Sequence, residues 1–170
     1  IAVMYQPCFN IEQIKLLMPE EALQVESKLR KLGQGSKVDA MIESMNRAAE
    51  DAASSSKELF VSAIKNLSVN DAMSILKGED NAATVYLSSE TRTQLIAKFK
   101  PIIKTSLDKV GATKHWTTVF NSYNKIPMVQ KVNPDLVGYA TDKAIDGLFI
   151  QIAKEELEIR KNPAARVTDL

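Results

Sequence analysis

Several polar residues in one helical segment have the types and spacing that acid–base chemistry needs. Asn46 and Glu50 lie one helical turn apart, and Arg47 and Asp51 repeat the same spacing. A glutamate buried beside such neighbours has a raised pKa and can act as a general acid or base. The alternative interpretation is a solvent-exposed strip of i,i+4 ion pairs, which is a common feature of helix surfaces.

A second group of polar residues falls near the carboxyl end of the chain, in what the apolar spacing predicts to be one long helix. Together the two groups form a candidate polar cluster of Asn46, Arg47, Glu50, Asp146, Glu155 and Arg160. Convergence of these side chains in one cleft would favour an enzyme that uses them as acid and base. Their dispersal over separate solvent faces would favour a structural role.

The residue types that bind metals are too few for the common metal sites. The chain has one Cys and one His, so it cannot build a Cys/His zinc site by itself. Asp142 and Asp146 are one turn apart, but dinuclear sites in helical bundles need two Glu-x-x-His pairs, and His115 has no Glu three residues before it. We therefore expect no metal and no cofactor, with His115 structural or exposed and Cys8 an incidental thiol.

The charges are distributed unevenly along a chain whose formal net charge is +1. Residues 98–131 contain seven lysines and one acidic residue. Aromatic residues, Trp116 and Phe120, lie among these lysines, which would suit an anionic partner such as nucleic acid or acidic lipid headgroups. The candidate contacts are Lys98, Lys100, Lys104, Lys109 and Lys114. Lysines that only solvate the outer face of core helices are the alternative, and nucleic acid is not expected because no arginine fork or known motif is present.

The elements that must position these residues are helices. Apolar residues recur in steps of three and four along nearly the whole chain, and only residues 1–9 resist this pattern. A chain of 170 residues with 45% apolar content fits one domain, and its apolar runs are shorter than the roughly 18 residues of a membrane span. We predict an all-α fold, a single compact bundle of about six to eight helices with short loops, covering residues 14–170 after an irregular N-terminal segment at 1–13.

Capping and breaking residues predict the helix boundaries. Serine, threonine and asparagine can accept hydrogen bonds from the first free amides, and glycine can end a helix in the left-handed conformation. The helices are predicted to begin at Pro19, Ser36 with Asp39, Ser68 with Asp71, Asn81, Ser88, Thr113 and about Leu136. The predicted interruptions are Gly33, the three serines at 54–56, Gly78, Pro101, Gly111 and Asn162.

Several blocks of sequence, in order, resemble a bacterial family catalogued as domain of unknown function 4197. The blocks include Met45-Asn46-Arg47-Ala48-Ala49-Glu50, Ile75-Leu76-Lys77-Gly78, Ala82-Ala83-Thr84-Val85-Tyr86, Lys143-Ala144-Ile145-Asp146-Gly147-Leu148-Phe149 and Asn162-Pro163-Ala164-Ala165-Arg166. The resemblance implies a helical protein of Gram-negative bacteria that is typically made with a signal sequence, and hence a periplasmic or otherwise exported location. It implies no catalytic role for any residue.

These observations leave three functions open. The leading hypothesis is a non-enzymatic exported domain that binds a protein partner or an apolar or amphipathic small ligand between its helices, since wide apolar faces accompany no recognisable catalytic set. The second is an enzyme that uses the candidate polar cluster. The third is a binder of anionic surfaces through residues 98–131.

Overall fold

The computed structural model describes residues 14–162, and every regular element in that range is helical. The α-helices of this range are α1 (Leu23–Leu29), α2 (Gly35–Ala53), α3 (Lys57–Lys65), α4 (Val69–Lys77), α5 (Ala82–Lys109), α6 (Ala112–Tyr123) and α7 (Leu136–Lys161). The all-helical prediction is therefore confirmed for the described part of the chain. The irregular segment expected at residues 1–13 lies outside it, and the division into domains stays a prediction.

Between residues 14 and 162 the helices form only five continuous stretches, so the expected six to eight helices with loops between them is slightly too many. The difference arises because no loop residues separate α1, α2 and α3, although Gly33 kinks the chain between α1 and α2. The short 3-10 turn Ser54–Ser56 joins α2 to α3. Its three hydroxyls each donate a hydrogen bond to the carbonyl three residues earlier, at 2.7 Å, which keeps the backbone helical through the serine run.

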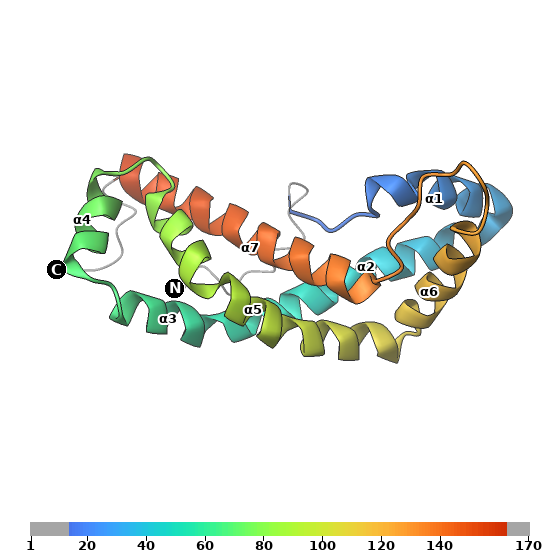
Figure 1. Ribbon diagram of the computed structural model, residues 1–170, viewed down its shortest axis with the longest axis horizontal. Helices are drawn as coiled ribbons and strands as arrows, with labels where there is room; N and C mark the ends of the chain where they lie inside the picture. Colours follow the sequence, from blue (N-terminus) through green and yellow to red (C-terminus); the bar gives the residue numbers. More distant parts are fainter. Residues whose placement is uncertain (1–13, 163–170) are drawn as a thin grey trace.

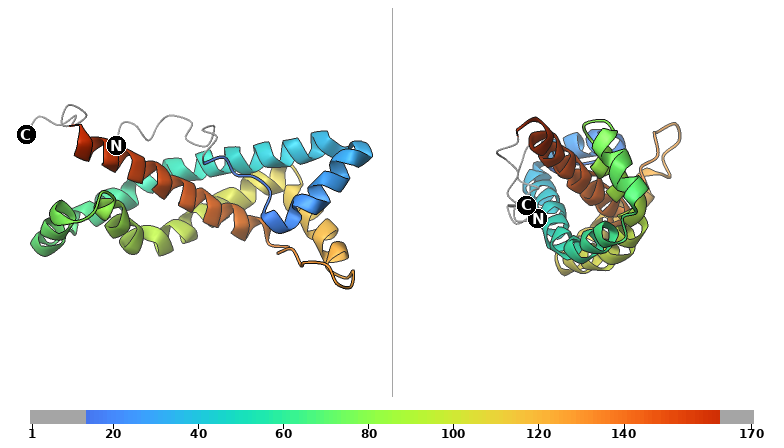
Figure 2. Two further views of the ribbon diagram at one scale, coloured as in Figure 1. Left: turned by 90° about the horizontal axis from the view of Figure 1, so that it is seen from above. Right: turned by 90° about the vertical axis from the view of Figure 1, so that its left-hand side faces the viewer.

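Three helical rows run side by side along the length of the molecule (Figure 1). One row is α2 continued by α3, the second is α5 and the third is α7. Helix α4 connects α3 to α5 at one end, while α1 and α6 lie at the other end (Figures 1 and 2). Within residues 14–162, no helix combines the length and the apolar content that crossing a membrane requires.

The core lies where α5 packs against α7 and α2, which are its most extensive interfaces. Helix α5 contributes a row of fully buried side chains at intervals of four residues: Leu95, Phe99, Ile103 and Leu107. Helix α2 faces it with the buried small residues Ala48, Ala49 and Ala52, which allow the helix axes to approach closely. The apolar rows seen in the sequence are thus the rows that meet in the core.

The segment at residues 14–19 lies extended across the helices instead of forming one. Its Leu16 and Met18 side chains are buried. The Tyr139 hydroxyl of α7 donates a hydrogen bond to the Leu17 carbonyl oxygen at 2.8 Å. This contact fixes the segment on α7, while α2 holds it from the other side through Asn46.

Some predicted boundaries are correct because the local chemistry decides them. Gly33 has φ of +76°, a left-handed conformation that ends the first helical run and admits glycine without strain. Ser68 and Asp71 form the predicted capping box: the Ser68 hydroxyl accepts from the Asp71 amide and the Asp71 carboxylate accepts from the Ser68 amide, both at 3.1 Å. Gly78 ends α4 as expected.

Other predicted caps are wrong. Helix α2 begins before Ser36, and Asp39 accepts a hydrogen bond from the Arg30 side chain at 2.7 Å instead of capping the helix. Helix α6 begins at Ala112, directly after Gly111 with φ of +71°, so Thr113 is not its cap. Gly111 is the N-cap of α6, while the left-handed Gly33 lies two residues before the start of α2, and neither helix start has a side-chain cap.

The predicted break at Ser88 and restart at Pro101 are also wrong, because α5 continues through both positions over 28 residues. The Ser89 hydroxyl donates to the Tyr86 carbonyl at 2.8 Å, within the helix. Phe99 and Ile103 are fully buried on either side of the proline. Packing of these neighbours holds the helix together where proline removes one backbone hydrogen bond.

Candidate functional site

Asn46 is a structural clamp. It is buried on α2, and its side-chain amide forms a two-way pair with the backbone of Leu16. The Leu16 amide donates to Asn46 Oδ1 at 2.8 Å, and Asn46 Nδ2 donates to the Leu16 carbonyl at 2.9 Å and to the Ile42 carbonyl at 2.8 Å. The Asn46 side chain thus satisfies both backbone groups of Leu16, as a neighbouring β-strand would. Its amide oxygen and both of its N–H groups are engaged in hydrogen bonds.

The other members of the candidate polar cluster bind different partners. Arg47 is exposed and pairs with Glu43 at 2.5 Å along α2, and Glu50 lies half-buried one turn after Asn46. Asp146 of α7 accepts from Arg92 of α5 at 2.7 Å in a partly exposed bridge between the two helices.

Glu155 accepts a hydrogen bond from Gln151 at 3.0 Å along α7. Within residues 14–162, no hydrogen bond or ion pair joins two members of the cluster to each other. Arg160 differs from the other members because it takes part in an assembly of partly buried hydrogen bonds around Glu156.

Glu156 is the centre of that assembly, and the sequence analysis did not select it. Its carboxylate reaches from α7 to the start of α5, where Oε1 accepts from the Ala83 amide at 2.9 Å and Oε2 accepts from the Thr84 amide at 2.8 Å and the Thr84 hydroxyl at 2.7 Å. These amides are among the free donors of the first turn of α5, whose Asn81 makes no side-chain cap. Glu156 therefore caps α5 from another helix.

Arg160 extends the assembly to α4. Its guanidinium donates two hydrogen bonds to Glu156 Oε1, at 2.9 and 2.7 Å, and one to the Ile75 carbonyl at 2.9 Å. The Ile75 carbonyl lies in the last turn of α4 and also accepts a hydrogen bond from the amide of the C-cap residue Gly78 at 3.3 Å. The pair of Glu156 and Arg160, which we call the polar tie, thus joins the end of α4 to the start of α5 and to α7.

The environment of Glu156 favours its charged form. Burial acts to raise the pKa of Glu156, but the hydrogen bonds from Ala83, Thr84 and Arg160 together outweigh burial and hold that pKa below its usual value. A signal for this residue was present in the sequence. Ile145, Phe149, Ile152 and Glu156 follow one apolar stripe of α7, and a carboxylate on a buried stripe requires partners.

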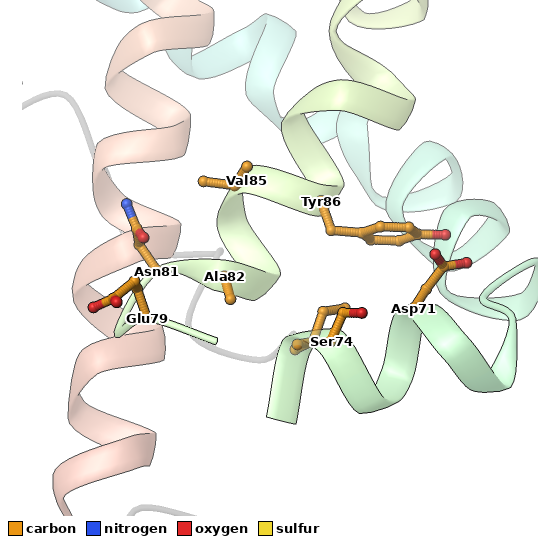
Figure 3. A pocket seen from close by; sticks show the side chains of 8 residues that line it. Asp71, Ser74, Glu79, Asn81, Ala82, Val85 and Tyr86 are labelled. Carbon is orange, nitrogen blue, oxygen red and sulfur yellow. The ribbon is translucent and has the colours of Figure 1, made fainter. Parts of the chain in front are cut away.

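Beside the polar tie, α4 and α5 enclose an open cleft of about 330 Å³. The residues that line it are Asp71, Ser74, Ile75, Glu79, Asn81, Ala82, Val85 and Tyr86. Figure 3 shows the Asp71 side chain of α4 and the Tyr86 ring of α5 directed toward one another across it. Ile75, whose carbonyl accepts from Arg160, belongs to the same lining, so the polar tie fixes one wall of the cleft.

The cleft is negatively charged. Its lining includes two carboxylates, Asp71 and Glu79, and no lysine or arginine. Hydrogen bonds from the side chain and the backbone of Ser68 hold the pKa of Asp71 below its usual value. Burial raises the pKa of Tyr86, and the negative charges of Glu90 and Asp71 raise it further.

Helix α4 also carries an apolar face, which is open to solvent and lies on the side of the helix away from the cleft. Val69, Met73 and Leu76 are 80%, 45% and 73% exposed, and α4 buries none of its own residues. Their spacing of i, i+4 and i+7 places them on one side of the helix. We call these three residues the α4 face.

The basic segment at 98–131 is partly engaged and partly open. Lys98 of α5 pairs with Glu58 of α3 at 2.6 Å, and Lys104 pairs with Asp108. Lys100, Lys109 and Lys114 are exposed.

Trp116 and Phe120 of this segment are buried and so are not available to a nucleic acid. Their ring centroids are 4.2 Å apart, and Trp116 Nε1 donates to the Asn133 carbonyl at 3.1 Å. They hold α6 on the core and leave no stacking surface. His115 beside them is exposed. Among residues 14–162, no group of three or more His, Cys, Asp or Glu side chains lies close enough together to hold a metal ion.

Comparison with known proteins identifies a family and no characterised relative. No curated protein and no solved structure matches the chain. The model of one family, described as Protein of unknown function (DUF4197), matches residues 7–170, which include the polar tie, the cleft and the α4 face. The chain therefore belongs to the DUF4197 family.

Proposed function

We propose that this protein is a non-enzymatic binding domain, and that the α4 face receives a basic amphipathic helix of a protein partner. The observation that carries the proposal is the exposed apolar row on α4. Three apolar residues at i, i+4 and i+7 form the type of surface on which amphipathic helices dock. These side chains expose apolar surface to water, and a partner that covers them would remove that surface from water.

An acidic residue near the α4 face selects the kind of helix. Asp71 lies on the side of α4 away from this face, whereas Glu79 follows the end of the helix, three residues after Leu76, and is exposed. A partner helix that places leucines on the α4 face and extends past Leu76 would bring lysines near Glu79 and be attracted electrostatically, while an acidic helix would be repelled. A small amphipathic cation in the cleft is the alternative, although about 330 Å³ is near the lower limit for small-molecule sites.

The placement of the candidate acid–base residues supports a non-enzymatic role. Asn46 uses its amide on the backbone of residue 16, Asp146 is paired with Arg92, and Arg160 donates to the Ile75 carbonyl as well as to Glu156. The contacts of Asn46 with residue 16, Asp146 with Arg92 and Arg160 with Ile75 each join two parts of the fold. Groups that are fully used in structural bonds offer no free proton donor or acceptor to a substrate.

A direct binding measurement tests this proposal. Fluorescence anisotropy would compare a labelled helical peptide of leucine and lysine with a matched peptide of leucine and glutamate. We expect binding of the lysine peptide only, and a loss of about tenfold in affinity for a Met73→Ser/Leu76→Ser variant. The matched control is Arg47→Ser, which alters an exposed side chain on α2.

Two results would refute the proposal. One is equal binding of both peptides, and the other is lysine-peptide binding that the α4 double variant does not change. Photo-crosslinking from position 76 in cells then identifies the natural occupant. A crosslink to a second copy of this chain, or to one of its own terminal segments, would also contradict a partner helix.

We further propose that the protein is exported. The support is the resemblance to a family whose members typically carry a signal sequence. Fractionation of cells that express the natural gene product tests the location, with recovery in the periplasmic fraction expected. Recovery only with the cytoplasmic fraction would refute export without affecting the binding proposal.

A further inference from the structure

The loop between α6 and α7 presents apolar side chains directly to solvent. It projects from the body of the molecule at the end opposite α4 (Figure 2). Met128 is 104% exposed and Ile126 is 52% exposed, so both are largely in water. Met128 also has φ of +63°, in the left-handed region that bulky residues rarely adopt. We call residues 125–131 the tip loop.

The base of the tip loop is fixed by hydrogen bonds. Asn124 Nδ2 donates to the Val132 carbonyl at 2.7 Å, and the Val132 amide donates to Asn124 Oδ1 at 2.9 Å, so the two ends of the loop are joined. Val132 is buried, and the next residue, Asn133, accepts from Trp116 at 3.1 Å. The body of the protein therefore holds the loop outward from a defined base.

Lysines flank the apolar tip. Lys125 and Lys131 are both exposed, one on each side of Ile126 and Met128. Residues 109–134 contain no Asp or Glu. Lys114, near the start of α6, is exposed as well. The tip loop thus combines an apolar point with a surrounding positive field.

We propose that the tip loop anchors the protein to the surface of an anionic lipid bilayer. Ile126 and Met128 would enter the boundary of the acyl chains, while the Lys125 and Lys131 side chains extend their amines to the phosphates above them. A projecting apolar tip needs no complementary pocket in a bilayer, whereas a protein partner would have to provide one. The inference is independent of the proposed function, which concerns the opposite end of the molecule.

Vesicle co-sedimentation of the full chain tests the anchor. The vesicles contain equal parts of phosphatidylglycerol and phosphatidylcholine, and vesicles of phosphatidylcholine alone are the comparison. Binding is expected on the anionic vesicles and should decrease steeply as salt is raised. Ile126→Ser/Met128→Asn should abolish it, since asparagine tolerates the left-handed backbone while removing the apolar side chain. Lys125→Gln/Lys131→Gln should weaken it by about tenfold.

Matched variants at other sites serve as controls. Lys100→Gln/Lys109→Gln removes the same charge from α5, and Met73→Ser/Leu76→Ser removes exposed apolar groups from α4. Retained binding in the α4 variant is expected even if the peptide proposal fails, so the two proposals can be distinguished. An equal loss of vesicle binding in the α5 lysine variant would indicate a diffuse charge effect and overturn the tip-loop proposal. Vesicle binding that survives the tip substitutions would also overturn it.

A fluorescent probe gives a second readout. The single cysteine, Cys8, allows a Cys8→Ser background in which Met128→Cys carries a polarity-sensitive dye. On anionic vesicles its emission should shift to the blue and be quenched by brominated lipid, while the same dye at Leu76→Cys should not respond. A dye at position 128 that stays in water on vesicle-bound protein would refute the proposal, as would absence of vesicle binding by the unmodified chain.

Discussion

Helices α4 and α6 are both short and amphipathic and lie at opposite ends of the molecule, yet they are attached in opposite ways. Helix α6 turns Ala112, Trp116 and Phe120 into the core. Helix α4 turns Val69, Met73 and Leu76 toward water. The bond from Arg160 to the Ile75 carbonyl ties its end to α7, while the capping box at its start stabilises the helix itself.

The difference shows that directional polar contacts can place a helix without covering it. Apolar packing fixes α6 by burying the surface that a partner would use. A hydrogen bond from Arg160 to the backbone ties the end of α4 to α7 and leaves the apolar side of α4 accessible. On this account α6 is a structural element, and α4 is a presented surface.

The largest expected effect is at the packed end. Trp116→Ala should lower the free energy of unfolding by roughly 3–5 kcal/mol, because it leaves a cavity and removes the bond to Asn133. Its counterpart at the presented end, Leu76→Ala, should change that free energy by less than about 0.5 kcal/mol. Urea unfolding followed by circular dichroism measures both. Similar losses in the two variants would erase the distinction between the helices.

The next effect concerns the polar tie. Glu156→Gln should cost roughly 2–3 kcal/mol of unfolding free energy, because it removes charged hydrogen bonds at the start of α5 and leaves Arg160 without its carboxylate. Glu155→Gln is the matched control, since Glu155 accepts a single hydrogen bond from Gln151. It should change stability by less than about 0.5 kcal/mol. Equal effects of the two substitutions would show that the tie does not fix this end.

The stability that Glu156 contributes should depend on pH. Its pKa is lower in the folded protein than in the unfolded chain, so its contribution is present above the unfolded value of about 4.3 and is lost as pH falls through the folded value. The difference in unfolding free energy between the natural protein and Glu156→Gln should therefore be constant near pH 7 and shrink below about pH 4. If the difference in unfolding free energy instead grew as pH fell, the pKa of Glu156 would be raised in the folded protein and not lowered.

A smaller and more local effect is expected at α4 itself. Arg160→Met keeps much of the side-chain length but removes the hydrogen bonds to Ile75 and Glu156. Amide hydrogen exchange in α4 should become faster, by an amount that corresponds to roughly 1–2 kcal/mol of local stability. Exchange in α6 should stay unchanged, which provides an internal reference. Uniform acceleration in both helices would indicate a global loss of stability instead.

The sequence predicts the all-helical class because the spacing of apolar residues can be read from neighbouring positions, and the same residues pack together in the core. The capping box at Ser68 and the left-handed turn at Gly33 were predictable for the same reason, since a few neighbouring residues decide them. The break expected at Ser88 failed because buried contacts further along α5 outweigh the local preference of serine.

The contacts of the candidate residues depend on distant parts of the chain. Asn46 bonds to a segment 30 residues away, and Glu156 caps a helix that begins more than 70 residues before it. No local pattern specifies such partners. The sequence does place Glu156 on the apolar stripe of α7. That position predicts that Glu156 is buried, but it does not identify the groups that donate hydrogen bonds to its carboxylate.

The central claim is that α4 presents an uncovered apolar face, and oxidative footprinting of the unmodified protein tests it most directly. Met73 lies on that face and Met128 on the tip loop, while Met45 is fully buried. Limited oxidation with peptide mass spectrometry should modify Met73 and Met128 early, with Met45 protected until the protein unfolds. Protection of Met73 equal to that of Met45 in the isolated protein would contradict the account.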